Sequence, residues 1–247
     1  MKIDYREYHF TKREWGLYIF QGILLCVIVN YLFYQNVVFF VFMIPIPLLW
    51  LKWKKQIRME RRKKELNYQF RDALNSLSVS LRAGYSIENG LIEAEKDMRK
   101  LNGNSAEIVQ ELSYINGQIK VSIPVEELLT DFGLRSDVED IRNFASVFAI
   151  ARKTGGNMTS IVAETAGSIS EKIDVERAIE TAVAAKKFEQ TIMSVMPCAI
   201  ILYMQLASPG FLDSLYGNLF GVLFMTACLC MYAMSWWAGR KIVEIEV

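Results

Sequence analysis

Two long apolar blocks at the ends of the chain constrain its fold more than any other feature. The first runs from Gly16 to Leu51 without a charged residue, and the second runs from Gln190 to Gly239 with Asp213 as its only charge. A membrane-crossing helix needs about 20 apolar residues, so each block is long enough for two crossings. Polar and turn-forming residues interrupt both blocks near the middle. The sequence therefore predicts four membrane helices, at 17–34, 37–51, 191–207 and 219–238.

The second of these helices is the least regular. Residues 37–51 form a short segment with Pro45 and Pro47, and the two prolines favour a kinked, tilted or only partly inserted helix. The first block does not resemble a cleaved secretory signal, because bulky residues continue where small residues would be needed for cleavage. We therefore expect residues 16–51 to be retained as a transmembrane hairpin.

The distribution of Lys and Arg predicts which side of the membrane each segment faces. The short connections within the two apolar blocks contain no Lys or Arg, whereas residues 52–64 contain eight. Cytoplasmic segments are enriched in these residues, so both termini and the middle of the chain are predicted to be cytoplasmic. The predicted organisation is a tail at 1–15, a transmembrane hairpin at 16–51, a basic collar at 52–65, a helical domain at 66–187, a second transmembrane hairpin at 190–239 and a tail at 240–247.

The middle of the chain has the pattern of a cytoplasmic helical domain. Residues 66–185 contain 12 Lys and Arg against 18 Asp and Glu, so this region is acidic although the whole chain carries a formal charge of +1. Apolar residues recur every three or four positions, which predicts amphipathic helices; in the first helix they are Leu66, Phe70, Leu74, Leu77 and Leu81. A bundle of about six helices is expected, at 66–83, 86–102, 108–119, 124–133, 136–152 and from 157 onward.

The ends of these helices carry recognisable signals. Gly84 is a natural C-terminal cap for the first helix, and Gly133 is expected to close the fourth. Ser136 followed three residues later by Glu139 predicts a capping box at the start of the fifth helix. Asn157 is expected to cap the sixth.

The sixth helix is predicted to be exceptionally long. From Asn157 to Met196 there is no proline, no cluster of turn residues and a single glycine, Gly167. The helix is therefore expected to continue without interruption from the cytoplasmic domain into the third membrane helix as far as Pro197. Its apolar residues are expected to pack on the other five helices; they include Ile161, Val162, Ile169, Ile173, Val175 and Ile179.

The chain has few residues that could support catalysis or bind a cofactor. Its single histidine, His9, leaves no zinc-binding histidine pair and no Ser-His-Asp triad, and no Gly-Lys pair marks a phosphate-binding loop. Carboxylates one helical turn apart, such as Glu107 and Glu111, are typical of solvated helix faces. We expect a non-enzymatic protein without cofactor or metal, and the low net charge argues against nucleic-acid binding.

The chain also lacks the usual features of a disulfide framework or of an ion-coupled transporter. Its four cysteines all fall within predicted membrane helices, where a thiol packs as a small apolar group. None of the four predicted membrane helices contains an ionisable Asp, Glu, Lys, Arg or His, which such a transporter would need near the membrane centre.

Three short motifs occur in an order that resembles a known family. The first helix ends in Leu-Arg-Ala-Gly-Tyr-Ser at 81–86, a later helix opens with Ile-Pro-Val-Glu-Glu at 123–127, and Ala-Arg-Lys-Thr-Gly-Gly-Asn-Met at 151–158 precedes the long helix. With the membrane layout, this order resembles the type II secretion system F domain over about residues 66–240. The chain is most similar to Tad pilus assembly proteins of the B and C type, because it carries one copy of the domain.

The resemblance implies an inner-membrane platform protein with both termini and its main domain in the cytoplasm. It implies three kinds of protein partner: a secretion or pilus ATPase, a homologous F-domain membrane subunit, and pilin-like proteins. It also implies assembly as a homo- or hetero-oligomer within the lipid bilayer. Candidate partner-binding residues lie beside the glycine turns, at Arg82, Gly84, Arg152, Lys153, Gly155 and Gly156. The alternative is a membrane-tethered signalling or scaffold protein without a motor partner.

Overall fold

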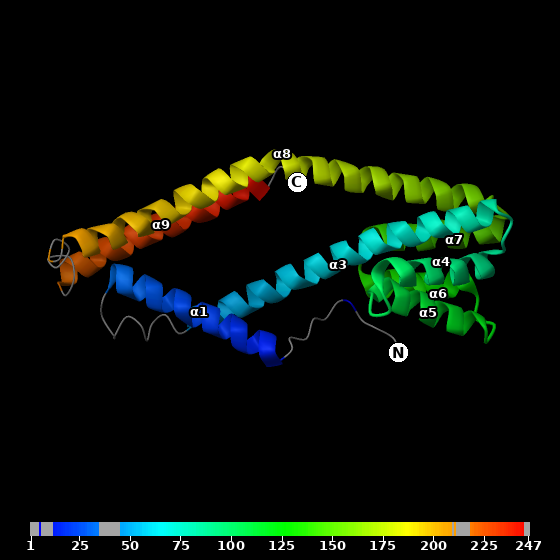
Figure 1. Ribbon diagram of the computed structural model, residues 1–247, viewed down its shortest axis with the longest axis horizontal. Coiled ribbons are helices and arrows are strands. Elements are labelled where there is room, and N and C mark those ends of the chain that lie inside the picture. The colour runs from blue at the N-terminus through cyan, green and yellow to red at the C-terminus, as the bar shows by residue number, and fades with distance from the viewer. Residues whose placement is uncertain (1–4, 6–11, 35–44, 209, 211–217, 245–247) are drawn as a thin grey trace. The chain divides into compact units, whose positions relative to one another are not determined.

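The protein is all-helical in its computed structural model, which describes residues 5, 12–34, 45–208, 210 and 218–244. The described residues form eight helices and no strand (Figure 1). The helices are α1 (Lys12–Phe33), α3 (Pro45–Arg82), α4 (Ile87–Asn102), α5 (Glu107–Ile119), α6 (Val125–Ser136), α7 (Glu139–Thr154), α8 (Met158–Ala207) and α9 (Leu219–Glu244). The prediction of an all-α fold is confirmed.

Close contacts divide the chain into two compact units. Unit 1 comprises Met1–His9 and Lys55–Val175, and unit 2 comprises Phe10–Lys54 and Glu176–Val247. The boundary at 54/55 falls inside α3, which spans 38 residues, and the boundary at 175/176 falls inside α8, which spans 50. Residues 52–65, expected as a basic collar ahead of the first bundle helix, are helical and form the middle of α3.

Unit 1 is a helical bundle with an aromatic centre. The ring centroid of Phe70 in α3 lies 6.1 Å from that of Phe132 in α6 and 5.6 Å from that of Phe144 in α7. Both pairs are edge-on, an arrangement that aromatic rings favour. Aliphatic residues of α3, α4 and α5 surround these rings. The apolar residues predicted to line the first bundle helix are all buried; they are Leu66, Phe70, Leu74, Leu77 and Leu81.

The first part of α8 completes this core. Val162, Ile169 and Ile173 are buried against the bundle, as the sequence predicts, and Ala166 is buried with them at the same helical spacing. Val175 is different, because 54% of its surface is exposed. The prediction that Val175 packs on the bundle is wrong: two positions after Ile173, it points away from the face that Ile173 buries.

The junction between α6 and α7 differs from the predicted one. Helix α6 does not end at Gly133 but continues to Ser136. Gly133 is a glycine for a packing reason: it is buried, and a Cβ atom there would lie 3.0 Å from the Arg142 Cα atom. The expected capping box is absent. The Ser136 hydroxyl donates to the Gly133 carbonyl at 3.2 Å, and the left-handed conformation of Asp137 (φ 52°) separates Ser136 from α7.

Unit 2 contains the apolar helices. Among the described residues, three helices are long and apolar enough to cross a membrane: Trp15–Phe33 of α1, a stretch within α8, and Phe220–Ile242 of α9. Side-chain contacts hold them together, including a 3.0 Å hydrogen bond between the hydroxyls of Tyr34 and Thr226. The predicted membrane helix at 37–51 lies largely outside the described residues. The helices of unit 2 therefore have the length and composition of a membrane protein.

Candidate functional site

The turn between α3 and α4 contains two of the candidate partner-binding residues. Arg82 is the last residue of α3, and Gly84 follows in a left-handed conformation with φ 90°. The Gly84 N–H donates to the Leu81 carbonyl at 3.0 Å, which satisfies one of the free carbonyls at the helix end. Gly84 is required here because a side chain is strained at this φ. The turn leaves Arg82 exposed.

The turn between α7 and α8 contains the other four candidates. Arg152 and Lys153 occupy the last turn of α7, and Gly155 ends it in a left-handed conformation with φ 72°. Gly156 donates from its N–H to the Ala151 carbonyl at 2.9 Å. The Asn157 side chain then accepts a 3.2 Å hydrogen bond from the Ser160 N–H, so the prediction that Asn157 caps α8 is confirmed.

An ion pair brings the two turns to the same end of unit 1. The Arg152 guanidinium lies 3.4 Å from the Glu88 carboxylate in the first turn of α4. A hydrogen bond from the Glu88 backbone N–H lowers the pKa of that carboxyl, with further lowering by Ser86 and Arg152. Glu88 is therefore a firmly ionised group at the N-terminus of α4, where negative charge is favoured.

The surface formed by these two turns, which we call the two-turn surface, combines unpaired cations with exposed apolar groups. Within the described part of the chain, neither Arg82 nor Lys153 forms an ion pair, and both are exposed. One turn earlier on α7, Val147 and Ile150 are also exposed, Ile150 to 64%. Such a surface can bind a partner that presents acidic and apolar groups. We define the two-turn surface by Arg82, Arg152, Lys153, Gly84, Gly155 and Gly156.

A metal-binding cluster and an interior cavity are two features that could support chemistry in unit 1. Among the described residues, no group of three or more His, Cys, Asp or Glu side chains is placed to hold a metal ion. The cavity inside the bundle core is only about 20 Å³ and is lined by apolar residues such as Phe70, Leu91 and Phe148.

A buried polar network elsewhere in unit 1 was not predicted from the sequence. Glu111 of α5 has only 2% of its surface exposed, and the Arg135 guanidinium donates to both of its carboxylate oxygens, at 2.9 and 2.8 Å. The Tyr5 hydroxyl donates to the same carboxylate at 3.2 Å. The prediction that Glu107 and Glu111 form a solvated face is wrong for Glu111, because that side chain is buried. Glu107 is partly exposed and pairs with Arg62 of α3.

This network fixes Tyr5 on the bundle. Tyr5 is completely buried, its N–H donates to the Arg135 carbonyl at 3.2 Å, and its ring lies 4.8 Å from the Arg62 guanidinium carbon. Burial and the neighbouring carboxylates raise the pKa of Tyr5 far above its ordinary value. Hydrogen bonding to Glu111 raises the pKa of Arg135, and burial raises that of Glu107. The network is structural, since it lies in the interior.

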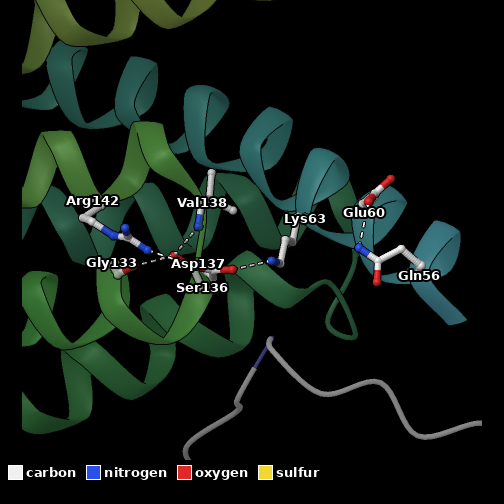
Figure 2. A network of polar contacts seen from close by, with 8 residues as sticks. All are labelled: Gln56, Glu60, Lys63, Gly133, Ser136, Asp137, Val138 and Arg142. Atoms are coloured by element: carbon white, nitrogen blue, oxygen red, sulfur yellow. Dashed lines mark hydrogen bonds and ion pairs between the residues drawn. The ribbon is translucent and has the colours of Figure 1, made fainter. Parts of the chain in front are cut away.

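A second polar contact ties the basic part of α3 to the α6–α7 junction (Figure 2). Asp137 accepts hydrogen bonds from the Lys63 ammonium at 2.6 Å and from the Arg142 guanidinium at 2.9 Å. The Lys63 hydrogen bond is the main cause of the lowered pKa of the Asp137 carboxyl. With Arg62 bound to Glu107, two of the eight basic residues at 52–64 thus hold the bundle together.

The fold defines a class of protein: all-helical, with helices that are long and apolar enough to cross a membrane. Comparisons with models of known families, with curated proteins and with solved structures found no match to this chain.

Proposed function

We propose that the chain is a non-enzymatic platform subunit of an inner membrane, in a type IV or Tad-like pilus or a type II secretion machine. It would couple a cytoplasmic ATPase to the assembly of pilin-like proteins. The resemblance of the three motifs at 81–86, 123–127 and 151–158 to the type II secretion system F domain is the reason for choosing this class.

The continuity of α8 is the observation that carries the proposal. The helix begins directly after the Gly155–Gly156 turn and buries Val162, Ile169 and Ile173 in the bundle. It then continues into its apolar stretch, where Pro197 lies inside the helix, and ends at Ala207. At 1.5 Å per residue, a 50-residue helix is roughly 75 Å long. A displacement of the bundle would therefore be transmitted along one hydrogen-bonded helix to the membrane.

The two-turn surface is the part of the bundle that we assign to the ATPase. It lies directly next to the start of α8, so a force applied there would act on the helix that leads to the membrane. Its free cations, Arg82 and Lys153, would attract an acidic partner surface. A homologous F-domain subunit would pair with this chain in the bilayer, and pilin-like proteins would be moved there.

The proposed orientation predicts which sites are reachable from outside the cell. In a variant whose four cysteines have been replaced, a cysteine introduced at Ser214, between the apolar segments of α8 and α9, should react with a membrane-impermeant reagent in intact cells. A cysteine at Asn104, between α4 and α5, should react only after the cells are opened, because unit 1 is expected to be cytoplasmic. The reverse pattern at either position would contradict the proposed topology.

Reversing the charges of the two-turn surface tests the assignment of the ATPase site. The double substitution Arg152→Glu and Lys153→Glu should leave the abundance and helical content of the protein unchanged, because both side chains are exposed. It should reduce capture of the ATPase in detergent by about tenfold or more, which corresponds to the loss of two charge-assisted contacts. Co-purification of the native complex measures this effect.

Two controls separate loss of binding from loss of structure. Glu88→Ala breaks the Arg152 ion pair without changing either candidate cation, so ATPase capture should stay within about twofold. Arg142→Glu, an exposed reversal at the α6–α7 junction, should also leave capture intact. Normal pilus assembly by the Arg152→Glu and Lys153→Glu variant would contradict the assignment of the ATPase site, and the two residues would then be ordinary exposed cations. Purification without any ATPase or pilin-like protein would favour the signalling or scaffold alternative.

A further inference from the structure

Unit 2 contains a cluster of tryptophan rings and cations that the proposed function does not use. The Arg240 guanidinium carbon, near the end of α9, lies 4.6 Å from the ring centroid of Trp236 and 5.1 Å from that of Trp53 in α3. One arginine therefore contacts indole rings from two helices that are far apart in the sequence. Such stacking holds the guanidinium in place while its N–H groups stay available at the edge.

Two lysines extend the positive charge of this cluster. The Lys54 ammonium lies 5.1 Å from the Trp50 ring centroid and 5.8 Å from that of Trp53, and Lys241 lies 5.3 Å from the Trp237 ring. In the part of the chain that the structure describes, none of the cations Lys54, Arg240 and Lys241 pairs with a carboxylate. Within the described residues, Lys54 and Arg240 thus place two positive charges beside Trp53 without a carboxylate partner, and Lys241 adds a third on Trp237.

A groove between α8 and α9 adjoins Arg240. It encloses about 300 Å³ and is lined by Gln190, Thr191 and Ser194 of α8 and by Trp236 and Arg240 of α9. The Gln190 side chain lies over Gly239, where an added Cβ would come within 2.7 Å of the Gln190 Nε2 atom. The groove therefore places an amide next to the guanidinium, and its lining has no carboxylate.

The cluster lies at the ends of apolar segments. The apolar stretch of α9 ends at Ile242, and Lys54 directly precedes the part of α3 that belongs to unit 1. Trp, Lys and Arg are enriched where a membrane helix meets the headgroup region of the bilayer. The groove would thus open at the depth where lipid phosphates are found.

We propose that Arg240, Lys54 and the α8–α9 groove bind the phosphate of an anionic phospholipid headgroup. A guanidinium can offer two parallel N–H groups to a phosphate, and Lys54 adds a second charge. A zwitterionic headgroup would bring an ammonium beside three cations with no carboxylate in the groove to receive it. This inference requires insertion in a membrane but does not depend on the platform role.

Tryptophan fluorescence of the full chain in neutral detergent measures this binding. Four of the five tryptophans belong to the cluster, so a bound headgroup should change their emission. The probes are short-chain phosphatidylglycerol, short-chain phosphatidylcholine and inorganic phosphate. Phosphatidylglycerol should bind at least about tenfold more tightly than phosphatidylcholine, and Arg240→Gln should weaken it by about tenfold or more. Lys55→Gln is the matched control and should change the affinity less than about twofold, because Lys55 is exposed and contacts no tryptophan among the described residues.

Three results would overturn the proposal. Equal binding of the two lipids would show that charge is not recognised, and equal effects of Arg240→Gln and Lys55→Gln would show general surface attraction. Inorganic phosphate that saturates the same signal with the affinity of the lipid would assign the site to free phosphate instead. If Arg240→Gln alters the helical content, the affinity of Lys54→Gln for phosphatidylglycerol tests the site instead. Several-fold weaker binding would support the site, and unchanged binding would overturn it.

Discussion

Ala185→Pro is expected to abolish pilus assembly while the protein still inserts in the membrane and binds its partners. Ala185 is an exposed residue of α8, positioned after the last bundle contacts at Ile173 and before the apolar stretch. Proline would remove the helical hydrogen bond to the Thr181 carbonyl and clash with the preceding turn, at a local cost of about 3 kcal/mol or more. The two ends of α8 would then be joined by a kink, and a displacement of the bundle would no longer reach the membrane.

Three measurements separate this effect from unfolding. Pilus assembly should fall to background, whereas the thermal unfolding of unit 1 should be unchanged, because its buried residues on α8 end at Ile173. Hydrogen exchange of the amides around position 185 should rise. Ala185→Leu keeps a strong helix former at the same exposed position and should behave like the original protein. Thr181→Ala should do the same. Normal pilus assembly by Ala185→Pro would mean that a flexible joint is tolerated there, and the role of α8 as a rigid coupling would be wrong.

The long helix α8 is predicted from the sequence. The sequence of α3 carries the same signal, but the prediction divides that helix. Between Asn157 and Met196 the lack of proline and turn clusters predicts one helix, and the structure extends it through Pro197 to Ala207. Residues 48–83 likewise contain no proline and no glycine. The change from apolar to basic residues at 52 indicates a change of environment, however, and not the end of a helix. The prediction of a segment boundary at this change is wrong, because it divides one 38-residue helix into three segments.

The candidate turns could also be located from the sequence, because glycines mark positions where backbone geometry is special. Gly84 and Gly155 have the left-handed conformations expected after a helix. Their proximity could not be predicted, since it depends on how the bundle helices pack; the exposed ion pair between Glu88 and Arg152, 64 residues apart, is a result of that packing. The same glycine rule failed at Gly133, where the missing side chain allows close packing of α6 on α7.

The buried network around Glu111 was missed although one sequence signal points to it. Glu111 lies between Ile108 and Ile115 at spacings of three and four residues, which places it on the apolar face of α5. A charged residue on such a face needs a buried partner. Nothing in the local sequence identifies that partner, because Arg135 is 24 residues away and Tyr5 belongs to the N-terminal tail. Only the packing of α5 against α6 brings these groups together.

Arg135→Ala is expected to cause the largest loss of stability of any single substitution in this network. It would leave the Glu111 carboxylate buried with the Tyr5 hydroxyl as its only remaining hydrogen-bond donor in the described structure. Removing one partner of a buried ion pair typically costs about 3–5 kcal/mol, because the remaining charge is neither solvated nor compensated. The free energy of unfolding, measured by denaturant titration of the full chain in detergent, should fall by that amount. Tyr5→Phe removes one hydrogen bond but leaves the ion pair, so it should cost only about 1 kcal/mol.

A paired substitution shows whether the loss comes from the unpaired charge or from the missing side chain. Glu111→Leu with Arg135→Met replaces both charges by apolar groups of similar size, so no buried carboxylate remains to be compensated. Such replacements are often neutral or stabilising, so the double variant should recover the stability that Arg135→Ala loses, less about 1–3 kcal/mol for the buried Tyr5 hydroxyl, which loses its acceptor. Lys172→Ala breaks a partly exposed ion pair with Asp140 at 3.0 Å, and Asp140 keeps its hydrogen bond from Asn67, so this comparison should cost less than about 1 kcal/mol. If Arg135→Ala cost no more than Lys172→Ala, water would reach Glu111 in the folded protein, and the network would not be the buried ion pair described above.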